Sequence, residues 1–123
     1  MISYHYNDSS GILETRFKDM IDPKEILEFM QAINKNEELP RTLNVLIDIR
    51  EADYVFEPIS IQHIVKANFR MNRSFKQINN AMLANNPNEP EIALYKQYVQ
   101  SSQNYRFEIF DDKDEAVKWL KRQ

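Results

Sequence analysis

The sequence predicts a single α/β domain, residues 1–123, with a mostly parallel five-stranded sheet and the element order ββαβαβαβα. Helix-like and strand-like segments alternate after two opening strands, which is the pattern of strand-helix-strand units. The expected strands, such as residues 43–50 and 105–110, place apolar residues at every second position. Because parallel strands between two helix layers read as continuous apolar runs, we expect the helices to lie mainly on one sheet face.

Residues 2–7 and 12–17 predict an opening β-hairpin at the edge of the sheet. Both segments alternate apolar and polar residues, and the residues between them, 8–11, read Asp-Ser-Ser-Gly. These residue types favour a tight turn, so the first strand should run antiparallel to the second.

A capping pattern predicts the start of the first helix. Asp22 can accept from the backbone, Pro23 suits the first helical position, and Glu25 lies three residues after the cap. This helix should end within residues 34–38.

The same reasoning places the later elements. Ser60 is the expected cap of a helix over 61–75, Asn88 of a helix through Val99, and Asp112 of the last helix. The intervening strands are expected at 43–50, 78–84 and 105–110.

The composition excludes several classes of function. The single glycine, Gly11, leaves no glycine-rich phosphate loop, and the absence of cysteine removes disulfides, thiolate metal sites and thiol catalysis. A net charge of -3 argues against nucleic-acid binding, and no apolar run is long enough to span a membrane. We therefore expect a cytoplasmic protein without a cofactor and without a catalytic motif.

The sheet face away from the helices is expected to be polar and to support self-association. Its apolar exceptions are Leu46 and Phe110, which two copies could cover while pairing their charges. A homodimer through this face or through the hairpin edge is the expected assembly. The polar residues assigned to the face are Ser3, His5, Glu14, Arg16, Asn44, Asp48, Arg106 and Glu108.

The element order and the closing segment 110–120, Phe-Asp-Asp-Lys-Asp-Glu-Ala-Val-Lys-Trp-Leu, resemble the STAS family in the broad sense, and more narrowly its bacterial SpoIIAA-like branch. The resemblance covers essentially the whole chain. It implies a βα superhelix and a non-enzymatic role in regulation or protein interaction.

The best-understood relatives in this family carry a phosphorylatable serine in an Asp-Ser-Ser-Gly-like turn before the second helix. Here that string occupies residues 8–11, in the opening hairpin, and the turn after the third strand has no hydroxyl. The phosphorylation site is therefore not carried over to this chain.

Two clusters of charged residues are candidate partner- or ligand-binding sites. Asp48, Arg50, Glu51 and Asp53 are expected in the loop leaving the third strand, where α/β sheets tend to bind ligands and where carboxylates could hold a hard cation. A solvated loop with local ion pairs is the favoured alternative for this cluster.

The second cluster follows helical spacing. His63, Lys66, Arg70 and Arg73 should share one face of the second helix and could meet an acidic partner, a phosphate group or an anionic membrane surface. An ordinary solvated helix face is again the favoured alternative.

Three functional hypotheses remain, and the first is preferred. The protein is an interaction or regulatory domain using the second helix, which predicts an exposed basic helix and no deep cavity. Alternatively it binds a small molecule, such as a lipid or a small anionic ligand, near residues 48–56, which predicts an enclosed pocket lined by tyrosines. Such a pocket was expected on the sheet face away from the helices, whose charges argue against it. The third hypothesis, an enzyme, would need Asp48 and Glu51 buried together beside a cleft.

Overall fold

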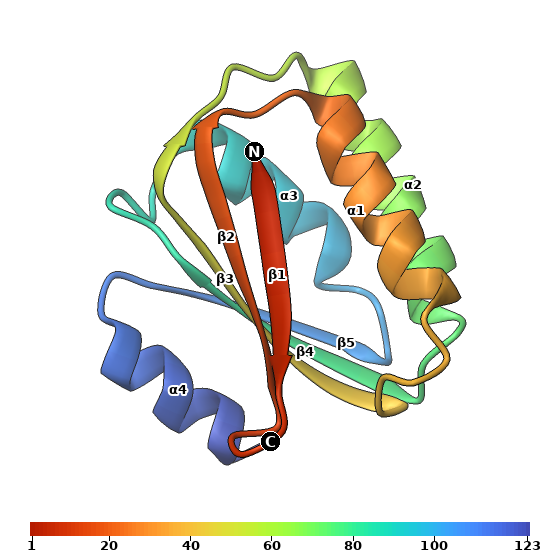
Figure 1. Ribbon diagram of the computed structural model, residues 1–123. Helices are drawn as coiled ribbons and strands as arrows, with labels where there is room; N and C mark the ends of the chain where they lie inside the picture. Colours follow the sequence, from red (N-terminus) through yellow and green to blue (C-terminus); the bar gives the residue numbers. More distant parts are fainter.

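A computed structural model describes the whole chain, Met1–Gln123, and its elements follow the predicted order. The strands form one sheet in the order β1-β2-β3-β4-β5, with β1 antiparallel to β2 and all other neighbours parallel (Figure 1). The elements are β1 (Ile2–Asn7), β2 (Ile12–Met20), α1 (Pro23–Lys35), β3 (Thr42–Asp53), α2 (Pro58–Asn72), β4 (Gln77–Leu83), α3 (Pro90–Val99), β5 (Tyr105–Phe110) and α4 (Lys113–Lys121). The predicted α/β fold with an antiparallel edge hairpin is confirmed.

The turn of the hairpin is held by Asn7 and Gly11. The Oδ1 atom of Asn7 accepts from the backbone N–H groups of Ser9 and Ser10 at 3.0 and 3.2 Å. Gly11 has a φ of 70°, a conformation that side chains disfavour. The turn therefore depends on the asparagine and the glycine more than on the serine hydroxyls.

The predicted cap of α1 is confirmed. Asp22 accepts from the backbone N–H of Lys24 at 2.8 Å, and Glu25 accepts in return from the N–H of Asp22 at 3.3 Å. The last helix likewise begins as predicted, because Asp112 accepts from the N–H of Asp114 at 3.2 Å.

The predicted caps of α2 and α3 are wrong by a few residues. The N-caps are Glu57 and Glu89 rather than Ser60 and Asn88, and neither makes a side-chain capping bond. In both helices a proline occupies the first turn, where its fixed φ and missing N–H fit the helix start. The proline decided these boundaries where the sequence analysis had favoured hydroxyl and amide caps.

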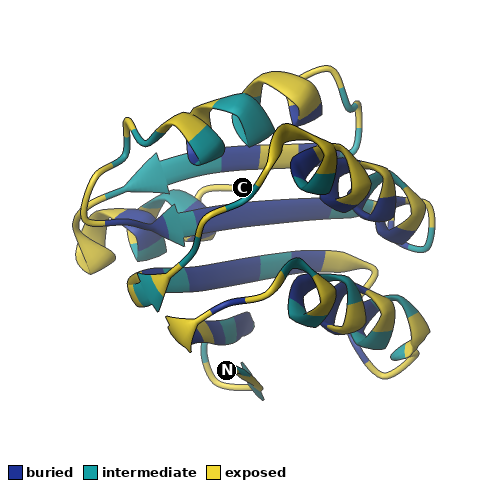
Figure 2. Cartoon of the chain, turned by 90° about the horizontal axis from the view of Figure 1, so that it is seen from above, coloured by how far each residue is buried: buried dark blue, intermediate teal, exposed yellow.

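Helices α1, α2 and α3 cover one face of the sheet, and this follows from the strand order. Each parallel strand lies beside the preceding one, and right-handed crossovers that advance in one direction place every connecting helix on the same side. Their buried residues and the facing strand residues form the main hydrophobic core. Figure 2 shows the buried sides of these helices turned toward the sheet.

Helix α4 lies on the opposite face, which corrects the expectation that this face is left open around Leu46 and Phe110. α4 does not connect two strands of this sheet, so the crossover rule does not hold it on the side of the other helices (Figure 1). Leu120 and Ala116 are fully buried against Leu46, which is 4% exposed. The Phe110 ring packs 5.9 Å from the Trp119 ring, measured between centroids. None of the four helices has the length and apolar character that crossing a bilayer requires.

Candidate functional site

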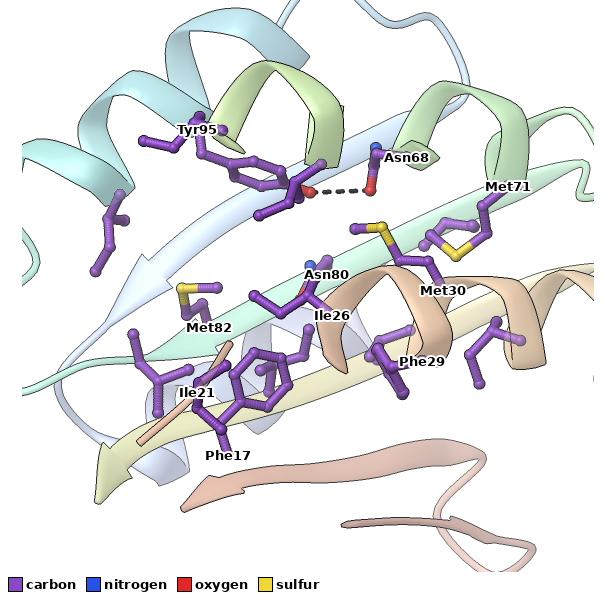
Figure 3. Close-up of a pocket in the computed structure, with 18 of the residues that line it drawn as sticks. Phe17, Ile21, Ile26, Phe29, Met30, Asn68, Met71, Asn80, Met82 and Tyr95 are labelled. Carbon is purple, nitrogen blue, oxygen red and sulfur yellow. Dashed lines mark hydrogen bonds between the residues drawn. The ribbon is translucent and has the colours of Figure 1, made fainter. Parts of the chain in front are cut away.

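An apolar cavity of about 110 Å³ lies between the sheet and helices α1, α2 and α3 (Figure 3). Its wall comes from strands β2 to β5 and from all three helices, and Asn68, Asn80 and Glu91 are its only lining residues that are not hydrophobic. A volume of this size is well above what one water molecule needs, and it approaches the ~150 Å³ of engineered apolar cavities that bind benzene. The cavity is therefore large enough for a small organic molecule. Its lining residues labelled in Figure 3 are Phe17, Ile21, Ile26, Phe29, Met30, Asn68, Met71, Asn80, Met82 and Tyr95.

Three methionines give the cavity wall an adaptable shape. Met30 from α1, Met71 from α2 and Met82 from β4 converge on it with flexible, unbranched side chains (Figure 3). Methionine adapts its shape to what it contacts, so these three can repack around occupants of different shapes.

A chain of hydrogen bonds forms the polar part of the wall. The Nδ2 atom of Asn80 donates to the hydroxyl of Tyr105 at 2.7 Å, and the hydroxyls of Tyr105 and Tyr95 lie 2.8 Å apart. The hydroxyl of Tyr95 donates to Oδ1 of Asn68 at 2.9 Å. One strand pair, β4 and β5, and two helices, α2 and α3, thus meet at four polar side chains.

Asn68 and Asn80, the two ends of this hydrogen-bond chain, each keep one polar atom without a partner. Asn68 is 0% and Asn80 5% exposed, yet Nδ2 of Asn68 and Oδ1 of Asn80 make no hydrogen bond. Leaving a buried polar atom unpaired costs about 1–3 kcal/mol, so most buried polar groups in proteins are paired. Unpaired amide atoms beside a cavity are the groups a ligand would satisfy.

The two tyrosines of this hydrogen-bond chain, Tyr95 and Tyr105, are strongly biased toward their neutral form. Burial raises the pKa of Tyr95 well above its usual value, and the neighbouring Tyr105 adds to the effect. Burial also raises the pKa of Tyr105 to about 12, although its hydrogen bonds with Tyr95 and Asn80 oppose the shift. No lysine, arginine or histidine lines the cavity, and Glu91 is its only charged residue.

The more exposed end of the cavity adjoins the segment between β3 and α2. Tyr54 and Phe56 line it there, next to Glu91 and Ile92 from the first turn of α3. The hydroxyl of Tyr54 donates to the carboxylate of Glu89, and burial together with this bond raises the pKa of Tyr54. The cavity thus lies beside residues 48–56, on the helix-covered face rather than on the opposite face where such a pocket had been expected.

The predicted charged loop of Asp48, Arg50, Glu51 and Asp53 is part of β3, which corrects the prediction. β3 continues to Asp53 because its pairing with β2 shifts register between Arg16 and Lys18 and then resumes, with Lys18 opposite Glu51. These four residues therefore belong to the last part of a strand and not to a loop.

The ion pair within this segment is local. The guanidinium of Arg50 donates to both carboxylate oxygens of Asp48, at 3.0 and 2.9 Å, and these bonds lower the pKa of Asp48. Glu51 and Asp53 are exposed, so Asp48 and Glu51 are not buried together in a cleft. No group of three or more histidine, cysteine or acidic side chains is placed to hold a metal ion.

The basic residues of α2 lie together as the helical spacing predicted. His63, Lys66, Arg70 and Arg73 are all exposed, and none takes part in the three salt bridges of the structure. They face away from the cavity, because the residues of α2 that line it, including Ile64 and Asn68, are on the buried side.

A second hollow, of about 250 Å³, lies on the α4 side of the sheet. It contains most of the polar-face residues predicted on β1 and β2, and both signs of charge are present: Arg16 pairs in register with Asp48, and His5 with Glu14. Lys113, at the start of α4, closes one side.

Asn68 and Asn80 were not among the site residues predicted from the sequence. Each occupies an apolar periodic pattern, Asn68 between Ile64 and Met71 on α2 and Asn80 between Ile78 and Met82 on β4. An amide at a core-facing position was the signal that could have identified them.

The chain has a SpoIIAA-like α/β fold, which confirms the resemblance at the level of the fold. It is similar in structure to an uncharacterized protein of the DUF3478 family with a SpoIIAA-like fold from Shewanella loihica PV-4, with a TM-score of 0.63. The identity is 18%, and the match covers 98% of this chain and 92% of that chain. No protein-family model and no curated protein matches the sequence.

Proposed function

We propose that this chain is a small-molecule-binding domain whose ligand occupies the cavity between the sheet and helices α1, α2 and α3. The observation that carries the proposal is the combination of an apolar cavity with two buried amides in its wall, Asn68 and Asn80, each of which keeps one polar atom unpaired. Ligand pockets typically join an apolar wall to a few placed polar groups. The exposed, locally paired charges of β3 offer no comparable enclosure.

This proposal was the second choice of the sequence analysis. The preferred interaction hypothesis predicted no deep cavity, whereas the binding hypothesis predicted a pocket lined by tyrosines near residues 48–56. The cavity is bordered by Tyr54, Tyr95 and Tyr105, which supports the binding hypothesis.

The test is whether small apolar probes enter this cavity. In methyl-labelled protein titrated with xenon, the NMR signals of Ile26, Met30 and Met82 should shift, while that of Leu120 on α4 should not. The variant Ile26→Phe, which fills the cavity, should lose the shifts. Val117→Phe, a matched substitution on α4, should keep them. Unchanged signals of the cavity residues in the folded protein at saturating xenon would contradict the proposal.

A second function, protein interaction through α2, is favoured by one specific observation. His63, Lys66, Arg70 and Arg73 form an exposed basic surface without acidic partners. Such a surface attracts acidic chains in a salt-dependent way.

Charge reversal tests this second function. The double variant Lys66→Glu with Arg70→Glu should weaken binding to polyglutamate at low salt. Lys113→Glu with Lys121→Glu changes the net charge equally on α4 and should have less effect. If both double variants lost polyglutamate binding equally, the loss would be an effect of net charge alone. α2 would then be rejected as a specific binding surface.

A further inference from the structure

The hydrogen-bond chain of the cavity wall has a definite polarity. If Asn80 donates to Tyr105, the Tyr105 hydroxyl donates to Tyr95, and the Tyr95 hydroxyl donates to Asn68, every hydroxyl proton is used once. The chain then ends in one free donor, Nδ2 of Asn68, and one free acceptor, Oδ1 of Asn80. Reversing both amides reverses the polarity but still leaves one donor and one acceptor.

The free ends therefore suit an occupant that both donates and accepts hydrogen bonds. A hydroxyl or a primary amide has both capacities, whereas a carboxylate only accepts and an ammonium only donates. A pure hydrocarbon would leave both amide atoms unpaired.

The charges around the cavity disfavour an ionised occupant. Because no cationic side chain lines the wall, a carboxylate head would lose its hydration without gaining a partner. Glu91 could pair with a cation, but it is partly exposed, so solvent would weaken such a pair. The high pKa of Tyr95 and Tyr105 keeps both hydroxyls neutral, so they supply no charge.

The volume limits the size of the occupant. The cavity, at about 110 Å³, is smaller than the engineered cavity of ~150 Å³ that binds benzene. It accommodates a body of about four carbon atoms without rearrangement of the walls.

We propose that the cavity binds small neutral amphiphiles, with a short apolar body and an uncharged head, such as an alcohol or a primary amide, that hydrogen-bonds to Asn68 and Asn80. This inference rests on the proposed small-molecule-binding function. It sets aside the anionic ligand considered from the sequence, because the cavity offers no cation to hold one.

Four probes that each contain four carbon atoms but differ in their head group test the inference. Butanol, butanamide, butyrate and butylammonium are titrated at neutral pH into nitrogen-labelled protein, and the side-chain amide signals of Asn68 and Asn80 are followed by NMR. Butanol and butanamide should bind at least about tenfold more tightly than either ion, because burying an unpaired charge is costly. They should also move both amide signals.

Amide variants separate the role of the head from that of the apolar body. Asn68→Leu and Asn80→Leu should weaken butanamide binding but preserve the response to xenon. Asn72→Leu is the matched control, because Asn72 is a buried α2 asparagine that also has an unpaired atom but does not line the cavity. This control should leave butanamide affinity unchanged.

The outcomes distinguish this inference from the proposed function. If xenon enters but butyrate or butylammonium binds as well as butanol, the inference is wrong and the binding function stands. The same holds if the side-chain amide signals of Asn68 and Asn80 do not move at saturating butanol. If xenon itself fails to enter, the binding function is wrong as well. The probe series uses the unaltered protein, so it remains decisive even where a leucine variant does not fold.

Discussion

Raising the pH above about 10 should destabilise this protein through its buried tyrosine pair. Tyr105 is 4% exposed, and burial raises its pKa to about 12, whereas a tyrosine in an unfolded chain has a pKa near 10. Between these two values the unfolded chain releases the proton that the folded protein retains. The unfolded state then binds fewer protons, so the free energy of unfolding falls as the pH rises.

The magnitude follows from the difference between the two pKa values. Each unit corresponds to about 1.4 kcal/mol, so Tyr105 contributes about 2–3 kcal/mol that is fully present below pH ~10 and lost by pH ~12. The pKa of Tyr95 is raised in the same direction, which adds to the loss in the parent protein.

Urea unfolding at a series of pH values, followed by far-ultraviolet circular dichroism, measures this contribution. Tyr105→Phe loses two hydrogen bonds and should be less stable than the parent at neutral pH. The difference should shrink by about 2–3 kcal/mol as the pH rises to about 12, since phenylalanine cannot ionise.

A non-ionising control completes the experiment. Phe17→Leu alters a buried aromatic side chain of β2 whose ring packs against Phe29 and not against Tyr95 or Tyr105, and its destabilisation should be independent of pH. If the free energies of unfolding of Tyr105→Phe and the parent differed by the same amount at every pH, Tyr105 would not be buried and hydrogen-bonded as described.

Three further predictions concern the rest of the molecule. Leu120→Ala should lower the free energy of unfolding by about 2–5 kcal/mol, because Leu120 of α4 is fully buried against the sheet; a urea measurement giving less than about 1 kcal/mol would contradict this packing. Replacing Ser9 and Ser10 together by alanine should change stability by no more than about 1 kcal/mol in the same assay, since the only hydroxyl bond is the 3.4 Å contact from Ser10 to a backbone carbonyl. The expected homodimer should weaken when Arg16 and Arg106 are both changed to glutamate, and a light-scattering mass of one chain at high micromolar concentration would remove it.

The dimer prediction now depends on charge more than on apolar surface. The dimer was predicted from charges of both signs on the open sheet face and from an exposed apolar pair there, Leu46 and Phe110. α4 buries the first and packs its tryptophan against the second, so only the charged part of the argument remains.

Local patterns in the sequence were sufficient to identify the elements and their order. Alternation marked most of the strands, Asp22 and Asp112 marked two helix starts, and the turn at Gly11 marked the hairpin. These signals are local because capping and strand alternation act over a few residues. The same locality explains the errors at Ser60 and Asn88, where more than one start was available and a proline decided between them.

Only the tertiary structure decided the side of α4 and the existence of the cavity. α4 does not connect two strands of this sheet, so the crossover rule does not constrain its face, and only its packing on β3 and β4 places it. The cavity is a mismatch in packing among side chains from seven elements, which no short pattern encodes. Asn68 and Asn80, twelve residues apart in sequence, acquire their shared role because two tyrosines on other elements connect them by hydrogen bonds.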